Sequence, residues 1–394
     1  MTDQDVLITG IGIVSSLGEG VDAHWSALSG ATPSPMIDDA RYAPYPVHPL
    51  VPVDWNLQIP KRSDQRQMEN WQRLGVYTAG LALDAAGLKG DEALCSTMDM
   101  IVAAGGGERD EAVDSGILQS SLTRADTEVL LNEKLTTELR PTLFLAQLSN
   151  LLAGNISIVH KVTGSSRTFM GEEGAGIAAV ETGVARIRCG QSTHVLVGGA
   201  FHTEHPDHFL ALELGGLLHR APWAPVWTRS GAEGGGLVAG SGAAFLMLES
   251  RAHAAARGRQ AFAAIEAVKS GRARRQGDGL AGVIGTMIDD VAGANARMQV
   301  ISGATGAHAA TEAEKAALDA REGLAVRGIA SLAGYMKEAQ FPFTLAIAAI
   351  AASRGKAFPP FDPAHERPAT EPTPVLATTI GCRRSEGVAL VTAA

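Results

Sequence analysis

The chain has 394 residues, 45% of them hydrophobic and 19% charged, which is long enough for two α/β halves or one large double domain. Its formal net charge of -9 disfavours nucleic acid and anionic lipid as partners, because both require a basic surface. The three cysteines, Cys95, Cys189 and Cys382, are widely spaced and indicate neither a disulfide framework nor a zinc site.

The first residues enter a strand-like run almost at once. "VLITGIGIV" (Val6 to Val14) is a short apolar run interrupted by glycine, which is typical of a buried strand. It is not preceded by a charged segment and a long apolar stretch, and no apolar run in the chain approaches the roughly 18 residues that span a bilayer. We therefore expect a cytoplasmic protein with no membrane association.

Further strand-like runs follow at similar intervals along the chain. They cover residues 100–106, 194–200, 242–249, 262–268, 298–304, 327–334 and 387–393. Helical patterns lie between them, for example Trp71 to Leu88. Because both halves alternate strands and helices in the same order, we expect a duplicated α/β unit with two sheets and helices packed between and outside them. The boundary would lie in the helix-like connector at 250–258, giving halves of 1–250 and 251–394.

The segment "RTFMGEEGAGIAAVETGVARI" (Arg167 to Ile187) reads as a sharp turn that leads into an apolar helix. Many α/β enzymes present a nucleophile at such a turn. Here the turn carries two adjacent carboxylates, Glu172 and Glu173, and no Ser, Cys or Thr. The question is what two acids do at that place.

Several segments resemble the β-ketoacyl-ACP synthases. "VLITGIGIVSSLGEG" resembles the first strand and loop of that family, V-I-T-G-x-G-x-V-S-x-L-G, and "RSDQRQMENWQRLGVYTAGLALDAAGL" resembles the helix that follows. "GAEGGGLVAGSGAAFLMLESRAHAAARG" resembles the glycine-rich segment that ends the first half, and "KAFPPF" a late turn. The resemblance covers nearly the full length. It implies a thiolase-like fold, a duplicated layered α-β-α-β-α arrangement, without a cofactor.

The family performs a decarboxylating Claisen condensation with a cysteine at the elbow, two histidines and a lysine. In this chain the resemblance places other residues at those four positions: Glu173 for the cysteine, Gly303 and Met336 for the histidines, and Ser331 for the lysine. The glycine-rich gating loop of the family becomes "IGCRRSE", with Arg383 and Arg384 where the family has glycines. We therefore expect no catalytic residue of the condensation, and the chain resembles chain-length factors.

Two interpretations of the paired glutamates remain open. A carboxylate at a helix N-terminus is stabilised as an anion and is therefore a weak general base, but Glu173 could still act in altered acyl chemistry. Alternatively, the glutamates close a disused site, where buried carboxylates need partners. In that case we expect an ion pair from Glu172 or Glu173 to Arg383 or Arg384, which would close the former acyl pocket.

"HTEHPDHF" spaces His202, His205 and His208 three residues apart, which superficially suggests metal ligands. Pro206 interrupts a helical presentation, and no cysteine or carboxylate cluster completes a ligand set. We expect a solvated loop and no metal site.

A basic cluster, Lys61, Arg62 and Arg66, lies on an otherwise acidic chain. Because acyl carrier proteins are acidic, the cluster could dock one; a solvated helix start is the alternative.

The resemblance implies a non-catalytic subunit that pairs with an active β-ketoacyl synthase, as a heterodimer, in fatty acid or polyketide chain elongation on an acyl carrier protein. The interface would use the strand around Thr168 to Met170 and the segment from Glu108 to Leu152. Two alternatives are a malonyl-ACP decarboxylase that uses Glu173, and a homodimer that binds an acyl group or carrier without chemistry.

Overall fold

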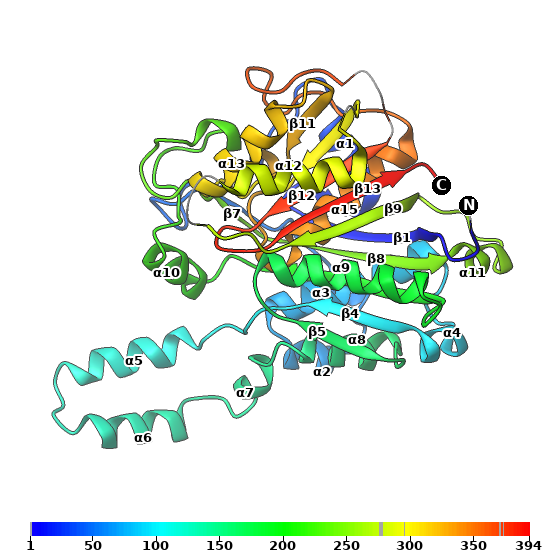
Figure 1. Ribbon diagram of the computed structural model, residues 1–394. Helices are drawn as coiled ribbons and strands as arrows, with labels where there is room; N and C mark the ends of the chain where they lie inside the picture. Colours follow the sequence, from blue (N-terminus) through cyan, green and yellow to red (C-terminus); the bar gives the residue numbers. More distant parts are fainter. Residues whose placement is uncertain (1, 276–278, 295, 370–371, 373) are drawn as a thin grey trace.

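The computed structural model describes residues 2–275, 279–294, 296–369, 372 and 374–394. Figure 1 shows a layered α/β body from which a pair of helices projects. Most of the strands belong to one continuous sheet in the order β11-β10-β12-β13-β9-β1-β8-β6-β4-β5, with β2 (Gly18–Glu19) paired to β1.

The first group of strands comes from the N-terminal part of the chain. These are β1 (Val6–Ser15), β4 (Asp99–Ala103), β5 (Ser166–Phe169), β6 (His194–Phe201) and β8 (Gly242–Ser250). Every residue of β1 is buried. A Cβ at Gly12 would lie only 2.0 Å from the carbonyl oxygen of Thr78, so glycine allows α3 (Asn70–Ala86) to pack directly on the strand.

The second group repeats the order and the directions of the first. It consists of β9 (Ala263–Gly271), β10 (Met298–Ser302), β11 (Leu324–Gly328), β12 (Val375–Ile380) and β13 (Glu386–Thr392). In each group two parallel pairs are followed by two antiparallel pairs. The expected pair of separate sheets needs correction, because Val6 to Ile8 of β1 pair with Ala263 to Ile265 of β9 and join the groups.

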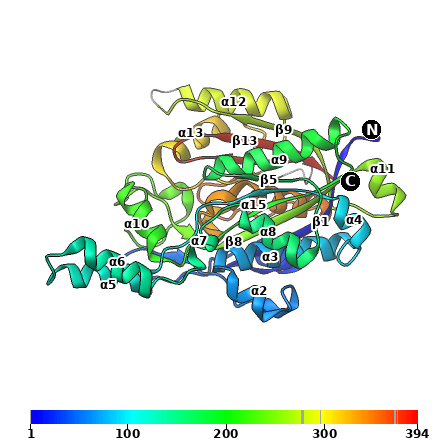
Figure 2. The ribbon, with the colours of Figure 1, turned by 90° about the horizontal axis from the view of Figure 1, so that it is seen from below.

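Helices lie between and outside the two strand groups (Figures 1 and 2). The central layer contains α9 (Glu173–Arg188) and α15 (Gln340–Arg354), and α15 is buried from Gln340 to Ala352. On the outer faces lie α3 and α8 (Leu151–His160) on one side, and α12 (Gly279–Ala292) and α13 (His308–Asp319) on the other. This confirms the layered α-β-α-β-α arrangement that the sequence predicts. A helix buried on all sides must be apolar all round, as α15 is.

The predicted strand at 327–334 is wrong in its position. Strand β11 ends at Gly328, and Ala330–Ala333 form the short helix α14. The run is apolar throughout because both elements are buried, so its pattern does not separate strand from helix. The polar edge strand β5 does not form an apolar run, so only the family resemblance, which places a strand around Thr168 to Met170, indicated it.

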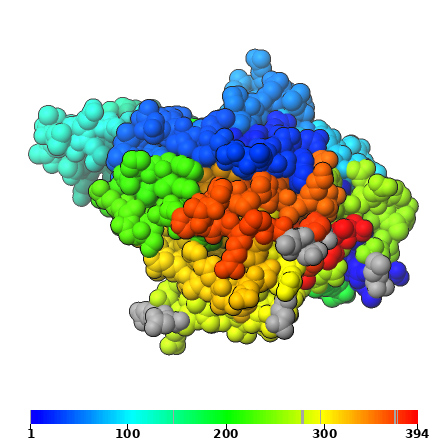
Figure 3. All heavy atoms as spheres, turned by 90° about the horizontal axis from the view of Figure 1, so that it is seen from above, coloured from blue at the N-terminus to red at the C-terminus, as the bar shows by residue number. Residues whose placement is uncertain are grey.

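A helical hairpin projects from the body. It consists of α5 (Glu111–Ser121) and α6 (Thr127–Thr137), followed by α7 (Leu143–Ala146), and is seen in cyan at the edge of the molecule in Figures 1 and 3. We call residues 111–146 the arm. Together with β5, the arm forms one end of the molecule.

The remaining elements are short and cover the body. They are α1 (Gly20–Ser29), β3 (Val47–His48), α2 (Arg62–Gln67), α4 (Glu92–Thr97), α10 (Pro206–Leu214), β7 (Ala239–Gly240) and α11 (Arg251–Ala256). Because α11 separates the two strand groups along the chain, we propose residues 1–250 and 251–394 as the two halves. In the part of the chain that the structure describes, no helix is long and apolar enough to cross a bilayer.

Candidate functional site

The turn between β5 and α9 has a strained backbone. Gly171 has φ 130°, and the next residue, Glu172, has φ 58° and ψ -138°, a conformation that residues other than glycine rarely adopt. Glu173 is then the first helical residue of α9. Such a sharp strand-to-helix turn is the geometry that places a side chain at the mouth of an α/β site.

The side chain of Glu173 points into the protein and is only 1% exposed. Its Oε1 accepts a hydrogen bond from the backbone N–H of Cys382 at 3.1 Å, and its own backbone N–H also bonds to the carboxylate. Oε2 has no partner. Burial raises the pKa of this carboxyl, and the nearby Glu172 raises it further. The carboxyl group of Glu173 therefore accepts hydrogen bonds from two backbone N–H groups, its own and that of Cys382.

Glu172 makes the contact to the arginine-containing loop. Its Oε1 lies 3.7 Å from Nη1 of Arg383, and both side chains are partly exposed. The structure thus brings Glu172 and Arg383 together. Among the described contacts Glu173 pairs with neither arginine, because Arg383 and Arg384 are both exposed while Glu173 is buried. Arg384 lies beside Gly171 instead.

Gly303 lies at the end of β10, in a space that has no room for a side chain. A Cβ there would lie 2.4 Å from Oγ1 of Thr379 and 2.8 Å from Oγ1 of Thr344. Contacts that short force the neighbours to move, so a histidine could not be accommodated at this position without rearrangement.

Met336 and Ser331 are both buried. The backbone N–H of Met336 donates to Oε1 of Gln340, and its thioether packs against Gly242. The hydroxyl of Ser331 accepts a hydrogen bond from the N–H of Val226 at 2.9 Å. The Met336 side chain therefore fills space in the core, and the Ser331 hydroxyl holds the backbone of Val226.

Three further residues reach the elbow, and the sequence did not single them out as site residues. Burial raises the pKa of Tyr335 well above its usual value, with Glu173 and Cys382 adding to the effect. Glu338 is buried and accepts a hydrogen bond from the N–H of Glu172. Burial raises the pKa of Glu338 as well. The thiol of Cys382 contacts Oγ1 of Thr305 at 3.4 Å. Burial raises the pKa of this thiol.

Another buried acid, Glu314, lies next to Ser302 at the end of β10. Its Oε1 accepts hydrogen bonds from Ser302 at 2.7 Å and Thr378 at 2.6 Å, whereas Oε2 has no partner. Complete burial raises its pKa to about 7, against the lowering effect of the two hydroxyls.

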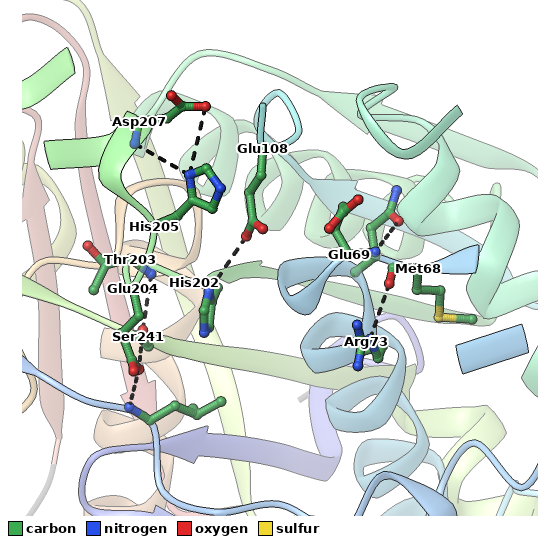
Figure 4. Close-up of polar contacts among 12 residues, drawn as sticks. Met68, Glu69, Arg73, Glu108, His202, Thr203, Glu204, His205, Asp207 and Ser241 are labelled. Carbon is green, nitrogen blue, oxygen red and sulfur yellow. Dashed lines mark hydrogen bonds and ion pairs between the residues drawn. The ribbon is translucent and has the colours of Figure 1, made fainter. Parts of the chain in front are cut away.

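The three histidines of "HTEHPDHF" do not form a solvated loop, which corrects that expectation. His202 is buried, with Nδ1 3.6 Å from Oε1 of Glu108 (Figure 4). Nε2 of His205 lies 3.3 Å from Oε1 of Glu111. Pro206 begins α10 rather than breaking it, because proline suits the first helical position. No group of three or more potential ligands is arranged to hold a metal ion among residues with a described position.

Within this cluster the carboxyl of Glu108 is stabilised as an anion. Its burial acts to raise the pKa, but the 3.6 Å contact with His202 and the charges of His202, His205 and His208 outweigh burial and lower the pKa. Sequence spacing could not reveal this partnership, since Glu108 and His202 come from loops that meet only in the fold.

Lys61, Arg62 and Arg66 are exposed on and just before α2, which projects from the side of α3 that faces away from the sheet (Figure 2). The three cysteines are free, with Cys95 buried and Cys189 exposed.

The strained backbone at Glu172 predicts that two variants at this position differ in stability. We expect Glu172→Gly to be more stable than Glu172→Ala by about 1–2 kcal/mol, because both lose the weak Arg383 pair but only glycine relieves φ 58°. Guanidinium unfolding of the two variants measures this. Equal stability, or a more stable alanine variant, would show that the turn is not strained.

Comparison with known proteins covers both the sequence and the fold. The 3-oxoacyl-[acyl-carrier-protein] synthase 2 of Vibrio cholerae is 23% identical over 274 residues, which is 67% of this chain. The match spans only 62% of the relative's own length. The solved ishigamide ketosynthase/chain length factor is 20% identical, covers 99% of both chains and superposes with a TM-score of 0.77. A ketosynthase solved in complex with a type II PKS acyl-carrier protein is 18% identical, covers 99% of both chains and gives a TM-score of 0.71.

These superpositions confirm the thiolase-like fold. The family description "Beta-ketoacyl synthase, N-terminal domain" matches residues 3–254, which is more than half of the chain. The chain therefore belongs to the β-ketoacyl synthase family.

Proposed function

We propose that this chain is a non-catalytic β-ketoacyl synthase homologue that pairs with an active synthase, in the manner of a chain-length factor, during fatty acid or polyketide elongation. The observation that carries the proposal is the position of Glu173. Its carboxylate takes up the backbone N–H groups at the elbow, where a condensing enzyme would need a free thiolate and an empty oxyanion site.

The surroundings of Glu173 support the same conclusion. Gly303 leaves no space for a histidine, and Met336 contributes an apolar side chain where the family has its second histidine. The proposal that Glu172 and Arg383 close the former pocket rests on their 3.7 Å ion pair, at the residue that precedes the buried Glu173.

We propose that the partner binds at the end of the molecule formed by β5 and the arm. Strand β5 is the last strand of the sheet, so its outer edge has unpaired backbone groups. Many large apolar side chains near that edge are exposed, which is typical of an interaction surface. They are Leu118, Leu122, Val129, Leu131, Leu135, Phe144, Leu145, Ile158 and Met170.

For the acyl carrier protein we propose docking at Lys61, Arg62 and Arg66. All three are exposed, and no described ion pair engages them, so their charges are available to an acidic partner.

The alternative of a malonyl-ACP decarboxylase needs Glu173 to reach a substrate. The hydrogen bond from Cys382 holds Oε1 against the protein and therefore argues against this role. A homodimer that binds a carrier would use the same surface and remains the second candidate.

Two measurements test the proposal. We expect purified protein to release no carbon dioxide from malonyl-ACP, and co-expression with a synthase to yield a heterodimer whose product length changes when this chain is replaced. A wild-type chain that decarboxylates malonyl-ACP at a rate that falls in Glu173→Ala would favour the enzyme. Recovery of homodimers alone, with unchanged synthase products, would contradict the chain-length role.

A further inference from the structure

The loop between β12 and β13 contacts Glu173 and is itself tightly folded. The backbone N–H of Gly381 donates to the carbonyl of Ser385 at 2.9 Å, which closes residues 381–385 into a turn that we call the elbow loop. Ser385 has φ 71°, and a Cβ at Gly381 would lie 2.1 Å from the carbonyl oxygen of Arg384. A serine with positive φ is strained, so contacts from outside the loop must hold this conformation.

One arginine outside the elbow loop bonds to both of its ends. Nη2 of Arg275 donates to the carbonyl of Gly381 at 2.9 Å and makes a longer contact of 3.4 Å with the carbonyl of Ser385. Arg275 belongs to the segment that follows β9, and its side chain is only 18% exposed. Because Gly381 begins the loop and Ser385 ends it, a single guanidinium joins the two ends.

The guanidinium of Arg275 is in turn held by a buried carboxylate. Glu386 is the first residue of β13, and its completely buried side chain forms an ion pair with Nη1 of Arg275. Its other oxygen, Oε2, accepts a hydrogen bond from the backbone N–H of Ala273 at 2.8 Å. Glu386 therefore fixes both Arg275 and the segment that carries it. Charge-assisted hydrogen bonds of this kind are the strong ones in proteins, and breaking a buried pair is costly.

The contact between Glu172 and Arg383 is the weaker of the two ion pairs at the elbow loop. Its atoms lie 3.7 Å apart, and both side chains are partly exposed. Ion pairs in contact with water contribute little, because solvent screens them and holding two mobile side chains costs entropy. The pair that fixes the loop is therefore the one between Arg275 and Glu386.

We propose that Arg275 is a positioning residue that keeps the elbow loop in one closed conformation against Glu173. In that conformation the N–H of Cys382 stays bonded to Oε1 of Glu173. All of these contacts lie within this chain, so the elbow is closed whether or not a partner subunit is bound. The inference therefore does not depend on the proposed function.

Hydrogen exchange measured by mass spectrometry on the purified protein tests this role. The amides of Gly381 and Cys382 are hydrogen-bonded in the closed loop and exchange only when the loop opens. In Arg275→Lys the ammonium can still pair with Glu386, but it lacks the planar fork that also reaches the ends of the loop. We expect the two amides to exchange at least about tenfold faster in this variant, because hydrogen bonds from a charged group are lost.

Arg321→Lys is the matched control. The side chain of Arg321 is 17% exposed, pairs with Asp289 and donates to the carbonyls of Ala317 and Gly285. Its replacement removes the same kinds of contact at a different place in the same half of the chain. We expect exchange at Gly381 and Cys382 to be the same in Arg321→Lys as in the wild type.

The amides of the buried strand β1 report on the stability of the whole protein. If Arg275→Lys also destabilises the fold, the β1 amides exchange faster too, so the proposal requires the loop to exceed the change in β1 about tenfold. Equal loop exchange in wild type and Arg275→Lys would overturn the proposal, as would free exchange of both amides in the wild type.

Glu172→Gln separates the two ion pairs at the loop. It removes the exposed pair with Arg383 and is expected to change the exchange of Gly381 and Cys382 by less than about threefold. An increase as large as that in Arg275→Lys would assign the closure to Glu172 and Arg383 and would contradict the role of Arg275.

Discussion

Replacing Glu249 by alanine is expected to destabilise the protein by about 3–5 kcal/mol, the largest effect that we predict for a single substitution. Glu249 is the penultimate residue of β8, its side chain is 0% exposed, and it joins three parts of the fold. It pairs with His253 and Arg257 from the connector after β8, the latter at 2.7 Å, and accepts from Thr9 of β1. Its loss would remove the buried carboxylate that Thr9, His253 and Arg257 all contact.

Urea or guanidinium unfolding measures this loss of stability. The pKa of Glu249 predicts how the loss depends on pH. Burial acts to raise the pKa of Glu249, but the hydrogen bonds from His253, Thr9 and Arg257 outweigh it and lower the pKa to about 2. The stabilisation is therefore present above about pH 4.5 and is lost as the pH falls through about 2. The control is Glu133→Gln, which breaks an exposed pair with Arg124 and should cost less than about 1 kcal/mol. A similar loss of stability in Glu249→Ala and Glu133→Gln would contradict the stabilising role of the contacts around Glu249.

Replacing Glu314 by glutamine is expected to remove a large pH dependence of the unfolding free energy. Its sign is opposite to that of the Glu249 contribution. The pKa of Glu314 is about 7 because the carboxyl is completely buried. A raised pKa means that the native state holds its proton more tightly than the unfolded chain. The contribution of Glu314 is therefore fully present below about pH 4.5 and is lost as the pH rises through about 7. The pKa shift from 4.5 to about 7 corresponds to about 3 kcal/mol of unfolding free energy.

The measurement is the difference in unfolding free energy between wild type and Glu314→Gln from pH 4.5 to pH 8. Glutamine can still accept from Ser302 and Thr378, so the difference at low pH should be small and should move in favour of the variant as the pH rises. Glu322→Gln changes an exposed glutamate of the same half and should give a flat difference. A flat difference for Glu314→Gln as well would show that its carboxyl titrates normally.

Much of the architecture could be predicted from local patterns. The glycine-interrupted apolar runs indicated β1, β4, β6 and β8, and their recurrence in the second half predicted the duplicated order. The apolar pattern failed at 327–334, which was predicted as one strand. There the end of a strand and a short helix are both buried, so both are apolar and the pattern does not separate them. An edge strand such as β5 has no apolar face pattern and could not be found in that way.

At the candidate site, the sequence identified the elbow but not its contacts. The turn and helix around Glu172 and Glu173 follow from local residue types. Which glutamate meets an arginine depends on the loop between β12 and β13, some 210 residues later, and the structure pairs Glu172 with Arg383. Glu338 and Tyr335 joined the site only because their loop packs against the same turn.

The sequence by itself determined the α/β class, the internal repeat and the family resemblance, because each depends on residues that are near one another in the chain or on their periodic spacing. Tertiary structure alone decided which polar groups are buried and what they face. That includes the backbone amides that hold Glu173 and the carboxyl pKa values of Glu249 and Glu314. The reason is physical: burial and electrostatic partnership depend on distances in space, and separation along the chain does not fix those distances.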